Sequence, residues 1–545
     1  MKNIIAFVLL LGLCSSCEED FLETAPYSFS SPENFYSNEV EIELAITAGY
    51  SVINDGSVMG NGNYDTFGRG LLFMLNGGTD ESITKEGFGN TDYAPWGLAS
   101  FNSTNKFLKY NWFYWYAGIN RLNLLLENLD GAEMEDEARR ETVRAEARFL
   151  RGLYHMYLAK MFGAIPTYTE SQADPEKARQ PLNEVYELII EDLKYAYENL
   201  DHRSSKTGRA NKWTAGGFLA ELYCYLGSCK KFGVGNDLAF PLNSFDWVDE
   251  DDMYAKALVV ASDVVDNSGY RLIDQYDYLF RATTSSYQRE ECLFMAEGSD
   301  DISNQRINIW VNNLLPQGNR DLVGGGYGWL RPTGEFYYKY TDGDFRRDHN
   351  LVGVIPNNAD YEEIDGIRYF IPNSISQLAE PTEFNSYTQG KFRVQDPKQK
   401  TVVNYGTEGN FPLLRFANIL LLKAEAQYFT GNEVEARNTI SIVRNRALED
   451  GYTVATLNNA YYKEDFVEEL LDERSRELAF ECQRRFDLMR FNKFDEAING
   501  LDVSNGRWNS VVAELKSNWV SHKIWFPLPL EQTEINPNLE QNPGY

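Results

Sequence analysis

Apolar side chains recur three and four residues apart over several long stretches of this chain, which is the period of a helix buried along one face. Residues 141–161 are the clearest example. One face of that stretch carries Ala145, Phe149, Leu153 and Tyr157. Gly163 and Pro166 come shortly afterwards, and both residue types end helices. The pattern therefore predicts a helix over residues 141–161.

The same period predicts further helices, several of which form pairs along the chain. They cover residues 112–129, 185–200, 212–226, 254–265, 413–428 and 436–446. In the last pair, Ala424 and Ala426 lie inside the first helix, and Gly431 and Ala436 follow at the turn. Small residues at these places allow two helices to pack closely, and helix pairs at near-regular spacing are typical of tetratricopeptide-like repeats. An insertion between residues 227 and 254 interrupts an earlier pair.

Residues 290–411 have a different pattern, rich in Gly, Asn, Pro and Tyr. Short strands are predicted there at 292–296, 352–355 and 367–371. Long loops of this kind usually carry function, and their aromatic content argues against disorder. We therefore expect a mainly α-helical protein with a loop-rich insert. We expect the ligand to bind at this insert and at the loop over residues 56–103.

The N-terminus has the pattern of an export signal. Lys2 precedes an apolar run over residues 4–13, which is too short to span a bilayer as a helix. Two serines then precede Cys17, whose thiol can carry a diacylglyceryl group, and the arrangement looks like a bacterial lipobox. It departs from the usual lipobox at Cys14, where Leu or Val is common. Cleavage before Cys17 would leave an acylated anchor. The alternative is a plain secretory signal with an incidental cysteine.

Composition narrows the classes of function. With 51 basic and 81 acidic residues the net charge is −30, which argues against nucleic acid, a partner that requires phosphate-neutralising side chains. The 4 histidines are scattered, so neither a metal site nor a His-based triad is predicted, and no cofactor is expected. The cysteines beyond the signal are expected to be free buried thiols, and a local bridge between Cys224 and Cys229 is the alternative. Aromatic residues make up 14% of the chain, and exposed ones can stack on the apolar faces of sugar rings.

Carboxylates cluster over residues 472–490, among them Glu473, Glu477 and Glu481. Paired carboxylates are the acid and base of glycoside hydrolases. Here they alternate with arginines three and four residues apart, which favours a helix-borne ion-pair network around an apolar stripe. We therefore expect a scaffold element and no enzyme activity.

Five blocks spread over the chain resemble the SusD/RagB family of outer-membrane nutrient-binding lipoproteins. They are CEEDFLETAP at 17–26, AEARFLRGLYHMYLAKMFGAIP at 145–166, the Ala-Glu-Ala helix before Gly431, DERSRELAFECQRRFDLMR at 472–490 and the ending QNPGY at 541–545. No single block is decisive, but their order over the full length is that of the family.

The resemblance implies a SusD-like helical scaffold of four tetratricopeptide-like helix pairs with an inserted ligand-binding region. A signal peptide over 1–16 would precede one domain over 17–545, made of an N-terminal part (17–289), the loop-rich insert (290–411) and C-terminal repeat helices with a tail (412–545). Glu18, Glu19 and Asp20 are similar to the acidic signal that sends such lipoproteins to the cell surface. The protein would face outward from the outer membrane, over a SusC-like TonB-dependent transporter.

The candidate ligand-binding residues are aromatic side chains with polar partners nearby. The aromatic ones are Tyr93, Trp96, Trp310, Tyr327 and Trp329, and the polar ones are Asn76, Asp80 and Arg331. Trp96 is similar in position to a family segment that often bears a sugar-stacking tryptophan, and the glycine run before Tyr327 permits close backbone approach. Amide, carboxylate and guanidinium groups bind sugar hydroxyls in pairs. For each tryptophan the alternative is burial in the scaffold.

The function implied is a surface glycan-binding lipoprotein of carbohydrate uptake and polysaccharide utilisation, which captures oligosaccharide and delivers it to the transporter. The alternative is a RagB-like transporter lid that binds peptide or another nutrient. The sequence does not identify the sugar or its linkage.

Overall fold

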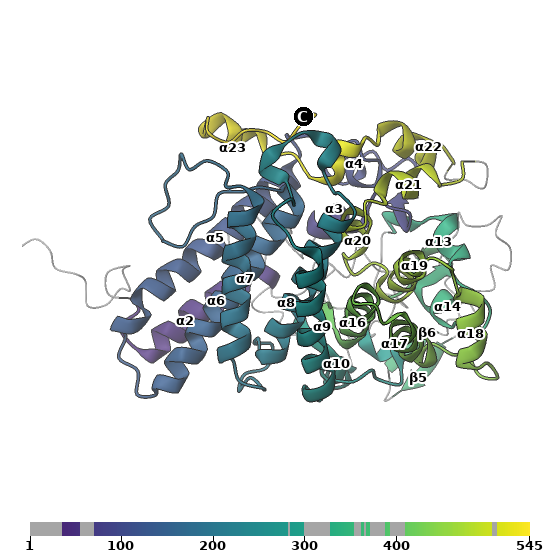
Figure 1. The fold of residues 1–545 in the computed structure, drawn as a ribbon, viewed down its shortest axis with the longest axis horizontal. Helices are drawn as coiled ribbons and strands as arrows, with labels where there is room; N and C mark the ends of the chain where they lie inside the picture. The colour runs from purple at the N-terminus through teal and green to yellow at the C-terminus, as the bar shows by residue number, and fades with distance from the viewer. Residues whose placement is uncertain are drawn as a thin grey trace, which may run out of the picture.

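The structure is a computed structural model that describes residues 35–54, 70–281, 284–298, 328–353, 361–364, 367–370, 387–392, 409–503 and 509–545. Its first half is a row of long helices, each packed on the next (Figure 1). They are α2 (Glu39–Asn54), α5 (Lys106–Asn128), α6 (Glu137–Phe162), α7 (Leu182–Asn199), α8 (Lys212–Lys231) and α9 (Glu250–Asn267). The row continues through α16 (Phe416–Phe429) to α17 (Glu433–Arg446), so the insert interrupts the sequence without interrupting the helix packing.

Side-chain caps set where these helices begin. Asn105 accepts a hydrogen bond from the Phe107 amide at the start of α5, and Asp136 accepts one from Ala138 at the start of α6. Asn211 and Thr214 form a capping box at the start of α8. Each cap satisfies an amide that would otherwise lack a partner. The helices predicted at 112–129, 141–161, 185–200, 212–226, 254–265 and 436–446 are all confirmed.

A glycine of one helix faces a tyrosine of its neighbour at three places along the row. A Cβ atom on Gly118 of α5 would lie 2.8 Å from Tyr154 of α6, and one on Gly216 of α8 would lie 2.8 Å from Tyr197 of α7. Gly227 of α8 faces Tyr254 of α9 in the same way, at 3.1 Å. The missing side chains allow close helix contact, and the pair 212–226 and 254–265 packs despite the intervening insertion.

The helix predicted at 413–428 is wrong at its start. Residues Phe411–Arg415 form strand β8, which pairs antiparallel with β2 (Cys292–Ala296), and α16 begins only at Phe416. Both strands are fully buried. A short apolar run fits a buried strand as well as a helix, so period alone does not separate them. The predicted strand at 292–296 is confirmed, and those at 352–355 and 367–371 match β4 (Leu351–Gly353) and β6 (Ile367–Phe370).

The remaining elements are short and lie mostly on one side of the row (Figure 1). The helices are α3 (Gly70–Asn76), α4 (Ala94–Gly97), α10 (Ser285–Glu291), α13 (Gly334–Tyr338), α14 (Arg346–Asn350), α18 (Val454–Tyr461), α19 (Phe466–Leu478), α20 (Arg484–Arg490), α21 (Phe494–Asn499), α22 (Asn509–Asn518) and α23 (Leu530–Ile535). The other strands are β1 (Ser82–Thr84), β3 (Leu330–Pro332), β5 (Tyr361–Ile364) and β7 (Tyr387–Gln389). The described strands form two-stranded antiparallel ladders, β1–β3, β2–β8, β4–β7 and β5–β6.

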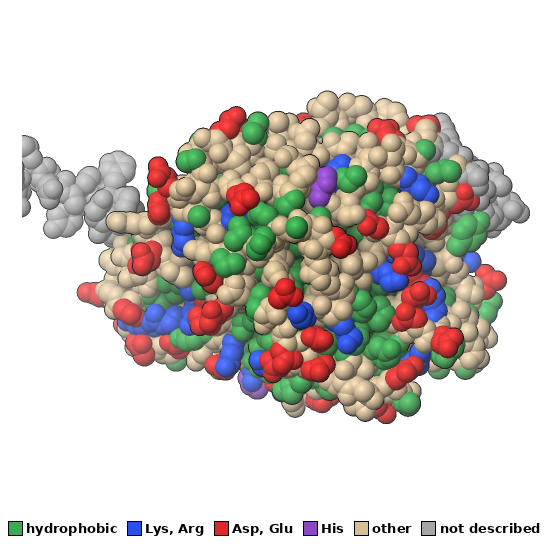
Figure 2. All heavy atoms as spheres, turned by 45° about the horizontal axis from the view of Figure 1, so that its top comes forward, with side chains coloured by type: hydrophobic (Ala, Val, Ile, Leu, Met, Phe, Trp, Pro, Cys, Tyr) green, Lys and Arg blue, Asp and Glu red, His purple; other side chains and the backbone are tan. Residues whose placement is uncertain are grey.

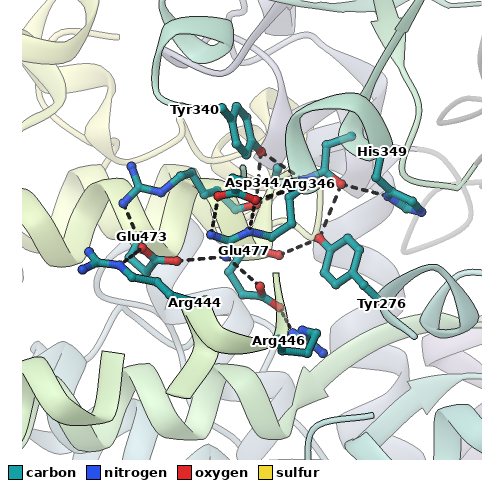
Figure 3. A network of polar contacts seen from close by, with 12 residues as sticks. Tyr276, Tyr340, Asp344, Arg346, His349, Arg444, Arg446, Glu473 and Glu477 are labelled. Atoms are coloured by element: carbon teal, nitrogen blue, oxygen red, sulfur yellow. Dashed lines mark hydrogen bonds and ion pairs between the residues drawn. The ribbon is translucent and has the colours of Figure 1, made fainter. Parts of the chain in front are cut away.

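The charged block over 472–490 is not one helix. The chain turns between α19 and α20, where Phe480 and Cys482 have positive φ. Its ion pairs are buried and mostly join different elements, whereas the sequence predicted a network along one helix. Arg346 of α14 is the centre: its side chain is 0% exposed and contacts Asp344, Glu473 and Glu477 at 2.7, 2.9 and 3.0 Å (Figure 3). The network therefore joins the insert to the C-terminal helices.

The C-terminal residues return to the N-terminal half. The Asn542 side-chain amide donates to the Phe162 and Phe526 carbonyls at 2.9 and 2.7 Å, and its oxygen accepts from Arg179 at 2.7 Å. The QNPGY ending is thus part of the scaffold. Cys224, Cys229, Cys292 and Cys482 are free buried thiols, as predicted. None of the described helices combines the length and apolar character that a membrane-spanning helix needs.

Candidate ligand-binding surface

The β1–β3 ladder brings together the two loop regions in which the ligand was expected. Ile83 lies opposite Arg331 and Thr84 opposite Leu330, and the Lys85 amide extends the ladder by donating to the Trp329 carbonyl at 2.8 Å. Residues more than two hundred positions apart in sequence therefore form one surface.

Three aromatic side chains gather where the ladder ends, and we call Phe88, Tyr93 and Trp329 the aromatic platform. Phe88 stacks on Trp329 with ring centroids 5.0 Å apart and planes 24° apart. Tyr93 lies 5.1 Å from Trp329, in a tilted arrangement. Phe88 and Trp329 are half-buried, whereas Tyr93 is buried. Beneath the platform, Tyr93 packs edge-on against buried Phe73 and Phe107 at 4.8 and 4.7 Å. The platform is thus held from below and reaches solvent above.

Polar groups surround the platform. Glu86 accepts a hydrogen bond from the Ser510 hydroxyl at 2.8 Å, and Asp92 pairs with Lys106 at 2.7 Å. Asn90 is exposed, and its side-chain oxygen accepts from the amide of Asp92. Rigid aromatic rings bordered by carboxylate, amide and ammonium groups suit a ligand with apolar faces and hydroxyl edges, which is the character of a saccharide.

The prediction that Trp96 stacks on a sugar is wrong for this structure. Its side chain is 1% exposed, and its ring stacks on Phe101 with centroids 4.7 Å apart and meets Phe526 edge-on at 5.2 Å. No face of the indole is open to a ligand. Trp96 is core, which is the alternative that the sequence left open.

The three predicted polar contacts are also buried. Arg484 donates to both carboxylate oxygens of Asp80 at 2.7 and 2.6 Å, and Lys339 lies 3.0 Å away. Although burial raises the pKa of Asp80, Arg484 and Lys339 hold that pKa well below its usual range. Asn76 bonds Cys482, and Arg331 lies within β3 at 2% exposure. These residues support the surface from behind and do not offer groups to a ligand.

Of the predicted site residues, the structure brings Tyr93 and Trp329 together in the platform. Trp310 and Tyr327 lie outside the described residues. The sequence interpretation missed Phe88, although an aromatic residue between Gly87 and Gly89 was a usable signal. Gly87 has φ +70°, and nothing lies within 4 Å of the place where a Cβ would sit on either glycine, so the loop leaves Phe88 uncrowded.

The carboxylates of Glu473, Glu477 and Glu481 have no access to a ligand. Glu473 and Glu477 are 0% exposed and paired with arginines, and Glu481 is paired with Arg415 at 2.7 Å. Arginine neighbours lower the pKa of Glu477 to about 2 against the effect of burial. Because these three carboxylates are buried and paired with arginines, they are not available as the acid and base that hydrolysis of a sugar requires. In the described part of the chain, no three His, Cys, Asp or Glu side chains gather as a metal site requires.

A pH-sensitive carboxyl lies directly before β1. Burial raises the pKa of Glu81 to about 7, and the Asp80 charge adds to this against the opposing effect of Arg484. The folded protein therefore binds this proton more tightly than the unfolded chain, for which the value is 4.5. We expect the free energy of unfolding to rise by about 2 kcal/mol through this group as pH falls from 8 to 5.

Glu81→Gln tests this expectation, because an amide does not titrate. Urea unfolding at pH 8 and at pH 5 measures the free energy of unfolding, and in Glu81→Gln its increase between the two pH values should be smaller than in the wild type. The control is Glu86→Gln, at an exposed neighbouring position, which should show the same increase as the wild type. An unaltered pH dependence in Glu81→Gln would contradict the assignment.

Comparisons with known proteins agree with this architecture. A family model described as "SusD family" matches residues 290–545, and one described as "Starch-binding associating with outer membrane" matches residues 20–224. The chain is 23% identical to SusD-like protein P25 of Formosa agariphila, over 100% of this chain and 99% of that protein. It is 25% identical to the starch-binding protein SusD of Bacteroides thetaiotaomicron, over 80% and 78% of the two chains.

Solved structures share the fold. A SusD homolog from Bacteroides thetaiotaomicron has a TM-score of 0.72 at 22% identity, covering 94% of this chain and 98% of its own. A structure described as a laminarin-binding SusD-like protein has a TM-score of 0.67 at 21% identity, covering 94% of this chain and 100% of its own. The predicted mainly α-helical, SusD-like fold is confirmed.

Proposed function

The chain belongs to the SusD family, and from this premise we propose that it is a cell-surface glycan-binding lipoprotein that captures oligosaccharide and delivers it to a SusC-like TonB-dependent transporter. The aromatic platform carries the proposal. Phe88 and Trp329 present partly exposed rings, fixed from below by buried aromatic side chains and bordered by polar groups.

Relatives support a saccharide as the ligand class. One curated relative is named a starch-binding protein, one solved relative is described as laminarin-binding, and another was solved with a xylogluco-oligosaccharide. The shared feature of these ligands is a chain of neutral sugar rings, whose apolar faces stack on aromatic side chains.

The proposed anchor is a lipid on Cys17, which lies outside the described residues. Acyl chains at the mature N-terminus would hold the protein on the outer membrane, with the platform free to meet nutrient. Cys17→Ser should move the protein from the membrane fraction to the soluble fraction of cells that carry it. Unchanged fractionation would count against the anchor.

Affinity gel electrophoresis of the purified chain tests the function. Gels containing starch, laminarin or xyloglucan should retard the protein in a concentration-dependent way in at least one case, and no new reducing ends should appear on incubation. Release of reducing sugar would overturn the assignment as a binding protein. Binding of peptides, with no glycan retained across a broad array, would favour the RagB-like alternative.

A further inference from the structure

A cleft of about 420 Å³ opens at a different place from the aromatic platform. Three segments form it: the turn 202–211 between α7 and α8, residues 268–271 after α9, and the end of α10 with β2. Figure 1 places α10 at the lower edge of the molecule and α4, beside the platform, at the upper edge. The two places are therefore well separated.

The charge of this cleft is opposite to that of the protein. The net charge is −30, yet the cleft is lined by five cationic side chains and two carboxylates. The cations are Arg203, Lys206, Arg209, Arg271 and Arg289, and the carboxylates are Glu290 and Glu297. Acidic and basic side chains are interspersed among the described residues on the face that Figure 2 shows, so a local excess of cations is not the general pattern. We call this site the basic cleft.

Two of these cations hold the turn 202–211 in place. Arg209 donates to Glu146 of α6 and to Thr47 of α2, both at 2.8 Å, and Lys206 pairs with Glu43 of α2. Their partners lie behind the turn, and their role is structural.

The other three guanidinium groups are exposed, one from each segment. Arg271 pairs with Glu290 at 2.6 Å and has a 58% exposed side chain, and Arg289 pairs with Glu297 at 3.2 Å and has a 44% exposed side chain. Arg203 is exposed and has no hydrogen bond or ion pair within the part of the chain that the structure describes. Exposed pairs contribute only about 0–1 kcal/mol to stability, so folding does not explain why three arginines converge here.

Neutral groups complete the lining. Tyr270 is half-buried, and its hydroxyl accepts a hydrogen bond from Asn211 at 3.0 Å, which fixes its ring. Ser204, Ser205 and Thr207 add hydroxyl groups. A fixed aromatic ring with hydroxyl groups suits a sugar, and guanidinium groups suit planar or tetrahedral anions because they donate two parallel hydrogen bonds.

We propose that the basic cleft is a second binding site, specific for an anionic saccharide whose carboxylate or sulfate ester groups contact Arg203, Arg271 and Arg289. The proposal rests on the proposed function only in that the ligand is a saccharide. The negative field of the whole protein repels an anion at long range, so binding depends on the close guanidinium contacts. Salt screening weakens such contacts between exposed groups.

The test is isothermal titration of the purified chain with three hexasaccharides: oligogalacturonate, a sulfated carrageenan oligomer and neutral maltohexaose. At least one anionic probe should bind at 50 mM salt and bind at least tenfold more weakly at 500 mM. The double variant Arg203→Ala/Arg271→Ala should weaken that binding at least tenfold. Both residues are exposed, so the melting temperature should stay unchanged.

Lys194→Ala/Lys256→Ala is the matched control, since it removes two exposed cations of α7 and α9 outside the cleft and should leave affinity unchanged. Binding of only the uronate, only the sulfate ester or both supports the proposal and identifies the anion. Failure of both anionic probes to bind, or equal affinity in wild type and the cleft variant, overturns it. Retention of neutral glycan through Trp329 would then still support the proposed function, so the two failures are distinguishable.

Discussion

Replacing Trp329 with alanine is expected to weaken glycan binding by at least thirtyfold while leaving the fold intact. Trp329 contacts both other rings of the platform and is itself half-buried, so its removal deletes the central stacking surface and loosens Phe88. Central aromatic residues of binding sites commonly contribute about 2 kcal/mol or more, which corresponds to that factor. Affinity gels and titration calorimetry with the retained glycan measure the loss, and circular dichroism checks the helix content.

Two tryptophan variants serve as controls for this result. Trp247→Ala removes a 38% exposed indole that stacks on Tyr186, away from the platform, and should leave affinity unchanged. Trp96→Phe alters the buried ring beside Phe101 and should lower stability slightly with affinity retained. Loss of binding in Trp96→Phe with full binding in Trp329→Ala would refute the placement of the site.

Replacing Arg346 with methionine is expected to lower the free energy of unfolding by about 3–5 kcal/mol, because it leaves buried carboxylates without their shared cation. Asp344 depends on Arg346 most, since among the described residues its one other side-chain partner is the Tyr461 hydroxyl at 2.9 Å. Glu473 and Glu477 keep other arginines, as Figure 3 shows for Arg444 and Arg446. Urea unfolding followed by circular dichroism measures the change.

The control for Arg346 is an arginine whose ion pair is exposed. Arg271→Ala breaks the pair with Glu290 and should change stability by less than about 1 kcal/mol. Adding Asp344→Asn to Arg346→Met should restore part of the loss, because it removes the least compensated charge. A loss below about 1 kcal/mol in Arg346→Met would show that the network does not hold the insert to the helices.

Local patterns were sufficient for most of the helical scaffold. The period of apolar residues is a property of neighbouring residues, and the helices that it predicted are present. The period of apolar residues gave wrong predictions where a segment pairs with another segment far away in the sequence. Residues Phe411–Arg415 read as helix but pair with β2, and the block over 472–490 turns at Phe480, where its arginines and carboxylates find partners on other elements.

In the candidate site, too, some residues could be predicted from their neighbours in the sequence, and others could not. Residue type and loop context identified Tyr93 and Trp329, and both belong to the platform. Trp96 has a similar local sequence and yet is buried, because Phe101 and Phe526 cover it from distant parts of the chain. Asp80 is equally unavailable, since Arg484 binds both of its oxygens. A side chain is buried when other side chains cover it, and here those come from distant parts of the chain. The residues next to it in the sequence therefore do not show whether it is buried.

The sequence by itself determined most of the helical scaffold, from the period of its apolar residues, and the resemblance to the SusD family, from blocks spread over the chain. The tertiary structure alone decided which aromatic and charged side chains are open to a ligand. The β1–β3 ladder joined Phe88 to Trp329, and three separate segments placed arginines around one cleft within a strongly acidic protein. The physical reason is that helix formation is decided by neighbours within a few residues, whereas exposure and charge pairing are decided by contacts between segments far apart in the chain.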